Sequence, residues 1–313
     1  MTKVLPSPPP LTVGRTPRKP RSRSRVDLSG YVFLAPWMIG FIFLTVGPML
    51  ASLYLSFTDY KLLAAPRWIG LHNYEKLLTD SRYHSAVMVT LKYVFIGVPA
   101  KLCFALLIAI VLKRSLRLTA VYRAVYYVPS LLGGSVAIAI LWRQLFGQPG
   151  VVQQLLALAH IDTQGWLTSP STALYTLVIL EVWQFGSPMI IFLAALKQIP
   201  QDLYDAASVD GAGRLRQFRS VTLPLLTPII FFNLILQMIG SFQAFTPSFV
   251  VSGGSGGPVD STLFYTLYLY IVGFGQLQMG YASAMAWVLL LGIALITGIL
   301  FATARYWVYY GDE

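Results

Sequence analysis

The chain alternates long apolar segments with short polar connections. Six apolar segments lie close to the length of about 20 residues that a helix needs to cross the hydrocarbon core of a bilayer. They occupy residues 31–55, 86–112, 121–144, 172–195, 227–250 and 281–304. Barrel strands need only about 9–11 residues, and an isolated strand cannot satisfy its backbone hydrogen bonds in lipid. The pattern therefore predicts an all-α membrane protein with six transmembrane helices.

One polar connection stands out between the fourth and fifth apolar segments. This stretch, at about residues 197–227 and here called the elbow, carries charges of both signs. Pro200 suits the first turn of a short helix, and Gly211 permits a break after it. A second short helix is expected to close at Leu223–Pro224, because proline has no N–H to donate to the next helical hydrogen bond. We therefore expect a helix-turn-helix between two membrane spans.

Composition and charge agree with a membrane protein. The 313 residues are 56% hydrophobic and only 11% charged, whereas a soluble domain carries about 25% charged residues. The chain carries a net charge of +11, and its Lys and Arg residues cluster in residues 1–26, in the second connection and in the elbow. By the positive-inside rule, both termini and the elbow face the cytoplasm. The basic charge thus indicates topology beside anionic membrane lipid, and no nucleic-acid partner is predicted.

The sequence predicts a short N-terminal tail followed by one long membrane domain. Residues 1–26 are rich in proline, serine and arginine and contain too little apolar material to fold, so they are predicted to be a disordered basic cytoplasmic tail. Residues 27–313 are predicted to form one six-span membrane domain. The single cysteine, Cys103, and three scattered histidines give no metal-binding pattern.

The elbow also carries a resemblance to a known family. Its run Tyr204-Asp205-Ala206-Ala207, followed by Asp210-Gly211-Ala212 and Leu223-Pro224, resembles the cytoplasmic "EAA" loop of ABC importer permeases. More narrowly, it is similar to carbohydrate permeases of the maltose and glycerol-phosphate transport class. The likeness covers about residue 28 to the end of the chain. One departure is Asp205, which replaces the family's glutamate with a carboxylate one methylene shorter.

This resemblance implies a partner set and a coupling surface. The family's elbow docks on a separate ATP-binding subunit. The residues implied at or near that contact are Asp205, Ala206, Ala207, Asp210, Gly211, Ala212, Leu223 and Pro224. The expected partners are a second homologous permease, two ATP-binding subunits and an extracellular solute-binding protein. The implied cargo is a carbohydrate or polyol derivative, moved by alternating access across the bacterial inner membrane.

The sequence itself contains no nucleotide-binding motif. There is no Gly-x-x-x-x-Gly-Lys-[Ser/Thr] in the chain, so ATP and Mg²⁺ are expected on the partner ATPase and no cofactor on this chain. No catalytic triad or paired-carboxylate motif occurs either, and the chain is not predicted to be an enzyme. An ion-coupled secondary transporter is the alternative. That class often shows inverted repeats, which are not evident here, and it leaves the elbow without a purpose.

Two charges fall inside apolar segments. Lys101 lies midway along the second and Glu181 lies within the fourth, and such residues are candidates for function. They could pair, or line a water-filled path. For Lys101 the favoured expectation is that the side chain snorkels toward the membrane surface. For Glu181 a functional role and a hydrogen-bonded place in helix packing are equally open.

Substrate contact is expected from polar and aromatic groups on the fourth and fifth segments. Sugars present many hydroxyls and flat apolar faces, which amides and aromatic rings suit. The candidates are Trp183, Gln184, Ser241, Gln243 and Phe245. Polar residues also mediate ordinary helix packing in membranes, so that alternative stays open.

Overall fold

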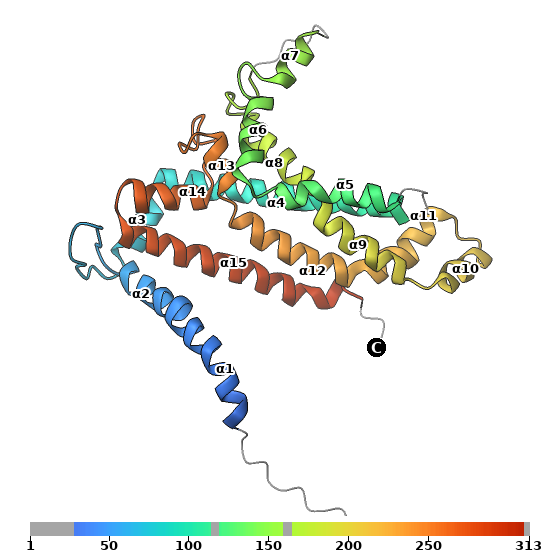
Figure 1. The fold of residues 1–313 in the computed structure, drawn as a ribbon, viewed down its shortest axis with the longest axis horizontal. Coiled ribbons are helices and arrows are strands. Elements are labelled where there is room, and N and C mark those ends of the chain that lie inside the picture. The colour runs from blue at the N-terminus through green and yellow to red at the C-terminus, as the bar shows by residue number, and fades with distance from the viewer. Residues whose placement is uncertain (1–27, 114–118, 159–164, 310–313) are drawn as a thin grey trace, which may run out of the picture. The chain divides into compact units, whose positions relative to one another are not determined.

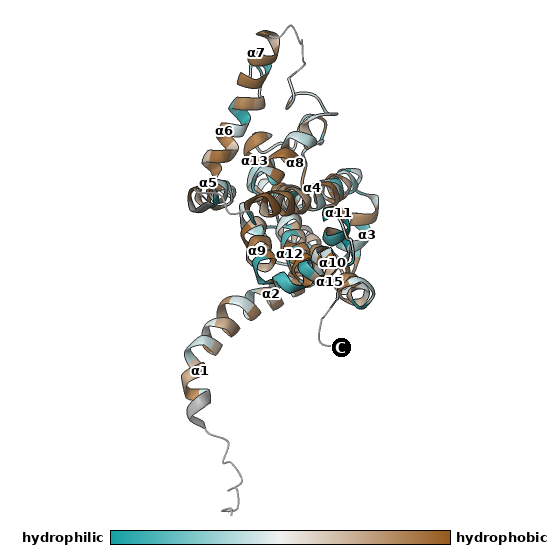
Figure 2. Cartoon of the chain, turned by 90° about the vertical axis from the view of Figure 1, so that its right-hand side faces the viewer, coloured by the Kyte–Doolittle hydropathy of each residue, from teal (hydrophilic) through white to brown (hydrophobic). Residues whose placement is uncertain are grey.

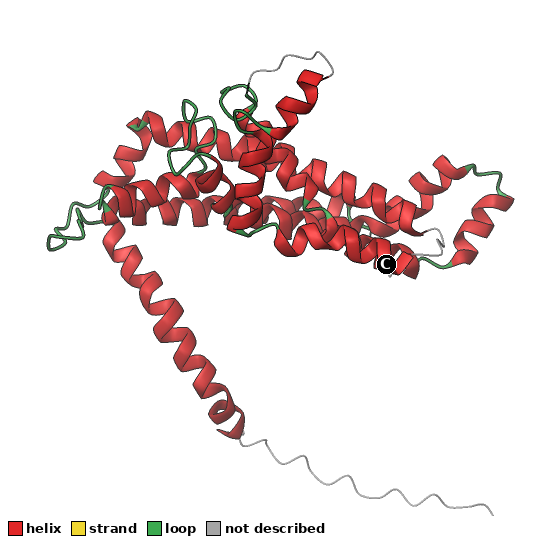
Figure 3. Cartoon of the chain, turned by 45° about the horizontal axis from the view of Figure 1, so that its top comes forward, coloured by secondary structure: helices red, strands yellow, loops and turns green. Residues whose placement is uncertain are grey.

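The computed structural model describes residues 28–113, 119–158 and 165–309. Regular secondary structure in these ranges is helical, apart from one antiparallel bridge pair between Thr58 and Trp68 (Figure 3). The all-α prediction is therefore confirmed for the described part of the chain. The predicted tail at residues 1–26 lies outside it. The chain divides into two compact units, residues up to Leu50 and residues from Ala51 onward.

The first apolar segment forms one nearly continuous helix. It consists of α1 (Leu28–Phe41), a π-helical turn (Ile42–Val46) and α2 (Gly47–Ser56), which runs on into the second unit. The π turn comes immediately before Gly47-Pro48, and the N–H of Gly47 bonds to the carbonyl of Ile42, five residues back. Such a widened turn lets a helix continue past a residue that cannot donate.

The elbow and the fifth span repeat this device. Here α11 (Arg214–Gln217) passes through a π turn (Phe218–Thr222) into α12 (Leu223–Phe242), and the N–H of Leu223 bonds to the carbonyl of Phe218. The expectation that Leu223–Pro224 closes the second elbow helix is therefore wrong. The π turn accommodates Pro224, and one helix of 29 residues runs from Arg214 to Phe242.

Long helices form the body of the second unit. The central one is α4 (Ser81–Lys113), which packs against α8 (Ala173–Trp183), α9 (Gly186–Gln198) and α12 (Figure 1). The last long helix, α15 (Met279–Trp307), packs against α12. Hydrophobic residues dominate these helices, as the brown ribbons in Figure 2 show. Each of α4, α11–α12 and α15 is long and apolar enough to cross a membrane.

Two predicted spans are bent pairs of helices. Residues 121–144 do not form one helix: α5 (Thr119–Leu132) ends before Gly133-Gly134, and α6 (Val136–Phe146), followed by α7 (Val151–Leu158), departs at 96°. In the fourth segment, α8 and α9 meet at 42°. The described residues therefore contain four unbroken candidate spans, or up to six if each bent pair counts as one.

Shorter helices complete the second unit. The predicted fifth span at 227–250 ends early, because α12 stops at Phe242 and a separate helix, α13 (Thr246–Val251), follows the break. The other short elements are α3 (His72–Thr79), α10 (Gln201–Val209), α14 (Tyr265–Tyr270) and a π turn (Ile271–Gly275).

A carboxylate fastens three helices at the end of the unit where α4 begins. Asp80 accepts the backbone N–H groups of Arg82 and Tyr83, which caps α4, and accepts the hydroxyls of Tyr268 at 2.6 Å and Tyr281 at 2.8 Å. Burial acts to raise the pKa of Asp80, but these four hydrogen bonds favour the charged form and leave the pKa lowered. The cluster holds α14 and α15 to the start of α4.

Candidate functional site

A polar cavity of about 350 Å³ lies where three interrupted spans meet. Its walls come from α4, from the break between α5 and α6, from the end of α8, and from the end of α12 with the start of α13. The lining residues are Tyr93, Lys101, Gly133, Gly134, Glu181, Gln184, Gln237, Gly240, Ser241, Gln243, Ala244, Phe245, Thr246 and Pro247. Helix breaks inside a membrane expose backbone and amide groups, which is tolerated where they line a cavity.

A buried ion pair forms one wall of the cavity. Lys101 donates to Oε1 of Glu181 at 2.9 Å, and the two side chains are 8% and 11% exposed. Tyr93 donates its hydroxyl to Oε2 at 2.9 Å, and Ser241 donates to Oε1 at 3.1 Å. The carboxylate is thereby hydrogen-bonded by groups from α4 and α12, as a buried charge requires.

The face of α4 explains how this carboxylate fits. Tyr93, Gly97 and Lys101 recur at i, i+4 and i+8 and so share one side of the helix. Gly97 lies opposite Glu181, and a Cβ added to it would stand 3.4 Å from Glu181 Cγ. A small residue between two donors thus leaves room for the glutamate side chain.

The favoured expectation for Lys101 is wrong. The ammonium does not snorkel to the membrane surface, because the buried carboxylate of Glu181 lies within reach of it. The other interpretation, that Lys101 and Glu181 pair, is the one that the structure shows. For Glu181 the hydrogen-bonded place in helix packing is present, and the side chain also lines the cavity, while its functional role stays a prediction.

The helix breaks beside the cavity interlock. Ser130 of α5 donates to the carbonyl of Gln184 at 2.9 Å and accepts the N–H of Ser187 at 2.9 Å, so it bridges the α8–α9 break. In return, the Gln184 amide donates to the carbonyl of Gly133 at the end of α5. Gly186 permits the close approach, because a Cβ there would lie 2.3 Å from the carbonyl oxygen of Tyr126. Each break satisfies backbone groups that the other exposes.

Four of the five predicted substrate residues line this one cavity: Gln184, Ser241, Gln243 and Phe245. The fifth, Trp183, does not, and its ring centroid lies 6.1 Å from that of Trp142 on α6. Trp183 is two residues beyond Glu181, which turns it about 200° around the helix, away from the cavity. Sequence reasoning missed Tyr93 as a cavity residue. The i, i+8 spacing of Tyr93 and Lys101 was the available signal.

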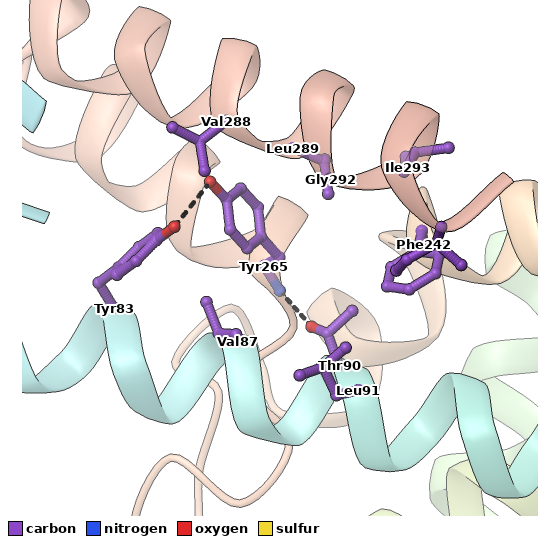
Figure 4. A pocket seen from close by; sticks show the side chains of 11 residues that line it. Tyr83, Val87, Thr90, Leu91, Phe242, Tyr265, Val288, Leu289, Gly292 and Ile293 are labelled. Carbon is purple, nitrogen blue, oxygen red and sulfur yellow. Dashed lines mark hydrogen bonds between the residues drawn. The ribbon is translucent and has the colours of Figure 1, made fainter. Parts of the chain in front are cut away.

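A second pocket, between α4, α14 and α15, is chemically different (Figure 4). It holds about 140 Å³ and is lined mainly by aliphatic and aromatic side chains. The few polar groups at its wall bond to each other: Tyr265 N–H donates to Thr90 Oγ1 at 2.8 Å, and its hydroxyl donates to the carbonyl of Met285. Such a lining offers a carbohydrate fewer hydrogen-bonding partners than the polar cavity does. The polar cavity is therefore the better candidate site.

The elbow, at α10 and α11, is a second candidate functional surface (Figure 1). Gly211 follows α10 with φ +74°. Its N–H bonds to the carbonyl of Ser208, and the N–H of Ala212 bonds to that of Ala207. This pair of bonds is the Schellman ending of a helix, which favours glycine at the left-handed position. The predicted break at Gly211 is therefore present.

Two side chains brace the elbow. Gln217 donates to Ser208 at 2.8 Å and to the carbonyl of Ala212 at 3.0 Å, closing the turn. The hydroxyl of Tyr204 hydrogen-bonds with that of Thr222 at 2.9 Å. Tyr204 also accepts from Lys113 at the end of α4, whose Nζ lies 4.3 Å from the ring centroid. The elbow is thus tied to the bundle as well as to its own two spans.

The predicted coupling residues divide between the outer face of the elbow and its junction with α12. Asp205, Ala206, Asp210 and Gly211 are exposed, whereas Ala207, Ala212, Leu223 and Pro224 are half-buried. Apolar side chains are exposed too: Val209 is 89% and Leu215 is 64% accessible. The elbow thus presents both acidic and apolar side chains to solvent.

Membrane-length helices around a hydrogen-bonding cavity are typical of membrane transport proteins. Within this class, the chain belongs to the family described as "Binding-protein-dependent transport system inner membrane component", which matches residues 86–306. This is a family of multi-pass membrane components. The family resemblance found in the sequence is confirmed.

Relatives agree with this assignment. The chain is 53% identical over 298 residues to the "Probable ABC transporter permease protein YesP" of Bacillus subtilis (strain 168), covering 95% of this chain and 96% of that protein. It is 32% identical to the "Lactose transport system permease protein LacF" of Rhizobium radiobacter, covering 89% and 95%. A chain of a bacterial ABC transporter that imports the acidic polysaccharide alginate has the same fold, with a TM-score of 0.74 at 21% identity, covering 89% and 96%.

Proposed function

We propose that this chain is the permease subunit of an ATP-driven, binding-protein-dependent importer of a carbohydrate or a sugar or polyol derivative. The observation that carries the cargo class is the polar cavity, whose lining includes amides, hydroxyls and one ion pair. A sugar hydroxyl both donates and accepts, so this lining suits it. Named relatives of this chain are permeases for lactose, arabinooligosaccharides and trehalose or maltose.

The energy for transport is proposed to come from partner subunits. The chain contains no phosphate-binding loop, so ATP and Mg²⁺ are assigned to two separate ATPase subunits. A second homologous permease completes the pathway, and an extracellular binding protein delivers the carbohydrate. The family assignment favours this arrangement over the ion-coupled alternative. Both termini and the elbow are assigned to the cytoplasmic side, because Lys and Arg are concentrated there.

The elbow is proposed to transmit ATPase movement to the spans. It joins α9 directly to the helix that begins at Arg214, so a displacement of the elbow reaches both cavity walls. Its exposed Asp205 and Asp210 lie on either side of exposed Val209 in the sequence, so a partner protein can contact both polar and apolar groups. Closing the ATPase dimer would then open the cavity outward, which is alternating access.

Purification and transport test this proposal together. The chain, isolated from its own membrane in mild detergent, should carry an ATPase and a second permease with it. In proteoliposomes with ATP and the binding protein, the complex should take up at least one of lactose, maltose or arabinooligosaccharides. Uptake driven by a proton or sodium gradient without ATP would overturn the proposal.

Two substitutions in the elbow test its role separately. Asp205→Arg or Gly211→Pro should abolish ATPase co-purification or uptake while the protein stays in the membrane. Glu75→Arg is the matched control, since Glu75 is also an exposed acid but lies on α3, outside the elbow. Normal uptake by both elbow variants would remove the elbow from the mechanism.

A further inference from the structure

The carboxylate of Glu181 joins three helices across the cavity. Lys101 and Tyr93 reach it from α4, and Ser241 reaches it from the last turns of α12. Glu181 itself lies in the last turn of α8, where its carbonyl accepts the N–H of Gln184 at the helix break. The Ser241–Glu181 bond is therefore a direct link between the two spans that the elbow connects.

This link lies far from the elbow on both spans. Glu181 is 17 residues before the end of α9, and Ser241 is 19 residues beyond the π turn that ends at Thr222. At 1.5 Å per residue these stretches correspond to about 25 and 28 Å of helix. The Ser241–Glu181 bond therefore joins the two spans at points far from the elbow. A bond at this position resists separation of the two spans when the elbow moves.

The link is also exposed to whatever occupies the cavity. Tyr93, Lys101, Glu181 and Ser241 all line it. A carbohydrate hydroxyl can donate to the carboxylate just as the Ser241 hydroxyl does. Displacing Lys101 is harder, because its bond at 2.9 Å joins two opposite charges that would otherwise be left unpaired in the interior. The two neutral contacts, from Tyr93 and Ser241, are the ones that a sugar hydroxyl can replace, and of these the Ser241 contact is the one that joins α8 to α12.

We propose that Glu181 is a positioning residue that makes helix movement depend on cargo. In the empty cavity the Ser241–Glu181 bond holds α12 against α8, and Lys101 and Tyr93 keep the carboxylate in place. A sugar hydroxyl that takes the place of Ser241 releases α12 from α8, so the elbow can move the two spans apart. This inference rests on the proposed function, because it takes the cavity to be the carbohydrate site.

ATP hydrolysis by the complete complex tests the link. The complex is reconstituted in proteoliposomes, and its hydrolysis rate is measured first without binding protein or saccharide. Ser241→Ala removes the α8–α12 bond, so the cargo-independent rate should rise about 5- to 10-fold, the effect of one hydrogen bond. Ser241→Thr keeps a hydroxyl and should restore the low rate. Thr303→Val is the matched control, since among the described residues Thr303 on α15 bonds to carbonyls of its own helix alone.

A second variant separates this effect from misfolding. Lys101→Met/Glu181→Gln keeps an amide in place of the carboxylate but removes both charges, which weakens the hold on Ser241. It should raise the cargo-independent rate in the same direction as Ser241→Ala. An unchanged low rate in an assembled complex carrying either variant would overturn the inference. A wild-type complex that no saccharide stimulates would instead overturn the proposed function, whatever Ser241 does.

Discussion

Removing Lys101 should destabilise the protein severely, whereas removing the whole ion pair should not. Lys101→Met leaves the carboxylate of Glu181 in the interior with two hydroxyl donors and no counter-charge. Methionine has nearly the length of lysine and fills the same space, so the substitution tests charge rather than packing.

The magnitude follows from the burial of the pair. Both side chains are about nine-tenths buried, at 8% and 11% exposure. Breaking a buried pair by removing one partner costs about 3–5 kcal/mol, because the remaining charge is uncompensated. Replacing both partners with uncharged groups of similar size is often close to neutral. The double variant Lys101→Met/Glu181→Gln should therefore regain most of the stability that the single variant loses.

Thermal unfolding of the purified chain in one detergent measures this difference. Lys92→Met is the matched control, because Lys92 lies on the same helix and is exposed. The expected order of midpoints places Lys101→Met lowest, with the double variant and Lys92→Met near the wild type. The reasoning fails if Lys101→Met unfolds with Lys92→Met, or if the double variant is no more stable than Lys101→Met.

Three further changes probe other contacts. Gly186→Ala would bring a Cβ within 2.3 Å of the carbonyl oxygen of Tyr126, so the thermal midpoint should fall by the equivalent of about 1–3 kcal/mol as α5 and α9 separate. Tyr204→Phe removes the hydroxyl that bonds to Lys113, and saccharide uptake per ATP hydrolysed should decrease in proteoliposomes if the elbow loses its brace. Asp80→Asn should lower stability at neutral pH. Because the folded pKa of Asp80 is below its ordinary value of 3.8, that difference is present above pH 3.8 and should disappear as the pH falls through the lowered value in acid titration.

Much of the architecture could be predicted from local sequence. Apolar segments of membrane length identify spans because lipid cannot hydrogen-bond the backbone, so each span must satisfy its own. The break after α10 could also be predicted from the sequence, since Gly211 suits the left-handed position that ends a helix. The candidate residues on the fourth and fifth spans were chosen because amides and aromatic rings suit the hydroxyls and apolar faces of a sugar, and four of the five line one cavity.

Other features depended on contacts that local patterns do not contain. Pro224 predicted a helix end, but the π turn at Phe218–Thr222 allows the helix to continue. The third span is bent at Gly133, where the exposed carbonyl is satisfied by Gln184 from 51 residues away. A sequence shows the glycines and the amide, but not that two breaks face each other.

The ion pair shows most clearly the difference between what local sequence predicts and what tertiary contacts set. The sequence by itself determined that Lys101 and Glu181 are charges within apolar spans, and that each therefore needs a partner or a route to water. Only the tertiary structure decided that the two charges pair with each other. The helices α4 and α8 pack with Gly97 facing Glu181, which brings Lys101 Nζ to 2.9 Å from Glu181 Oε1. A buried charge takes the nearest compensating group in space, and helix packing sets which group that is.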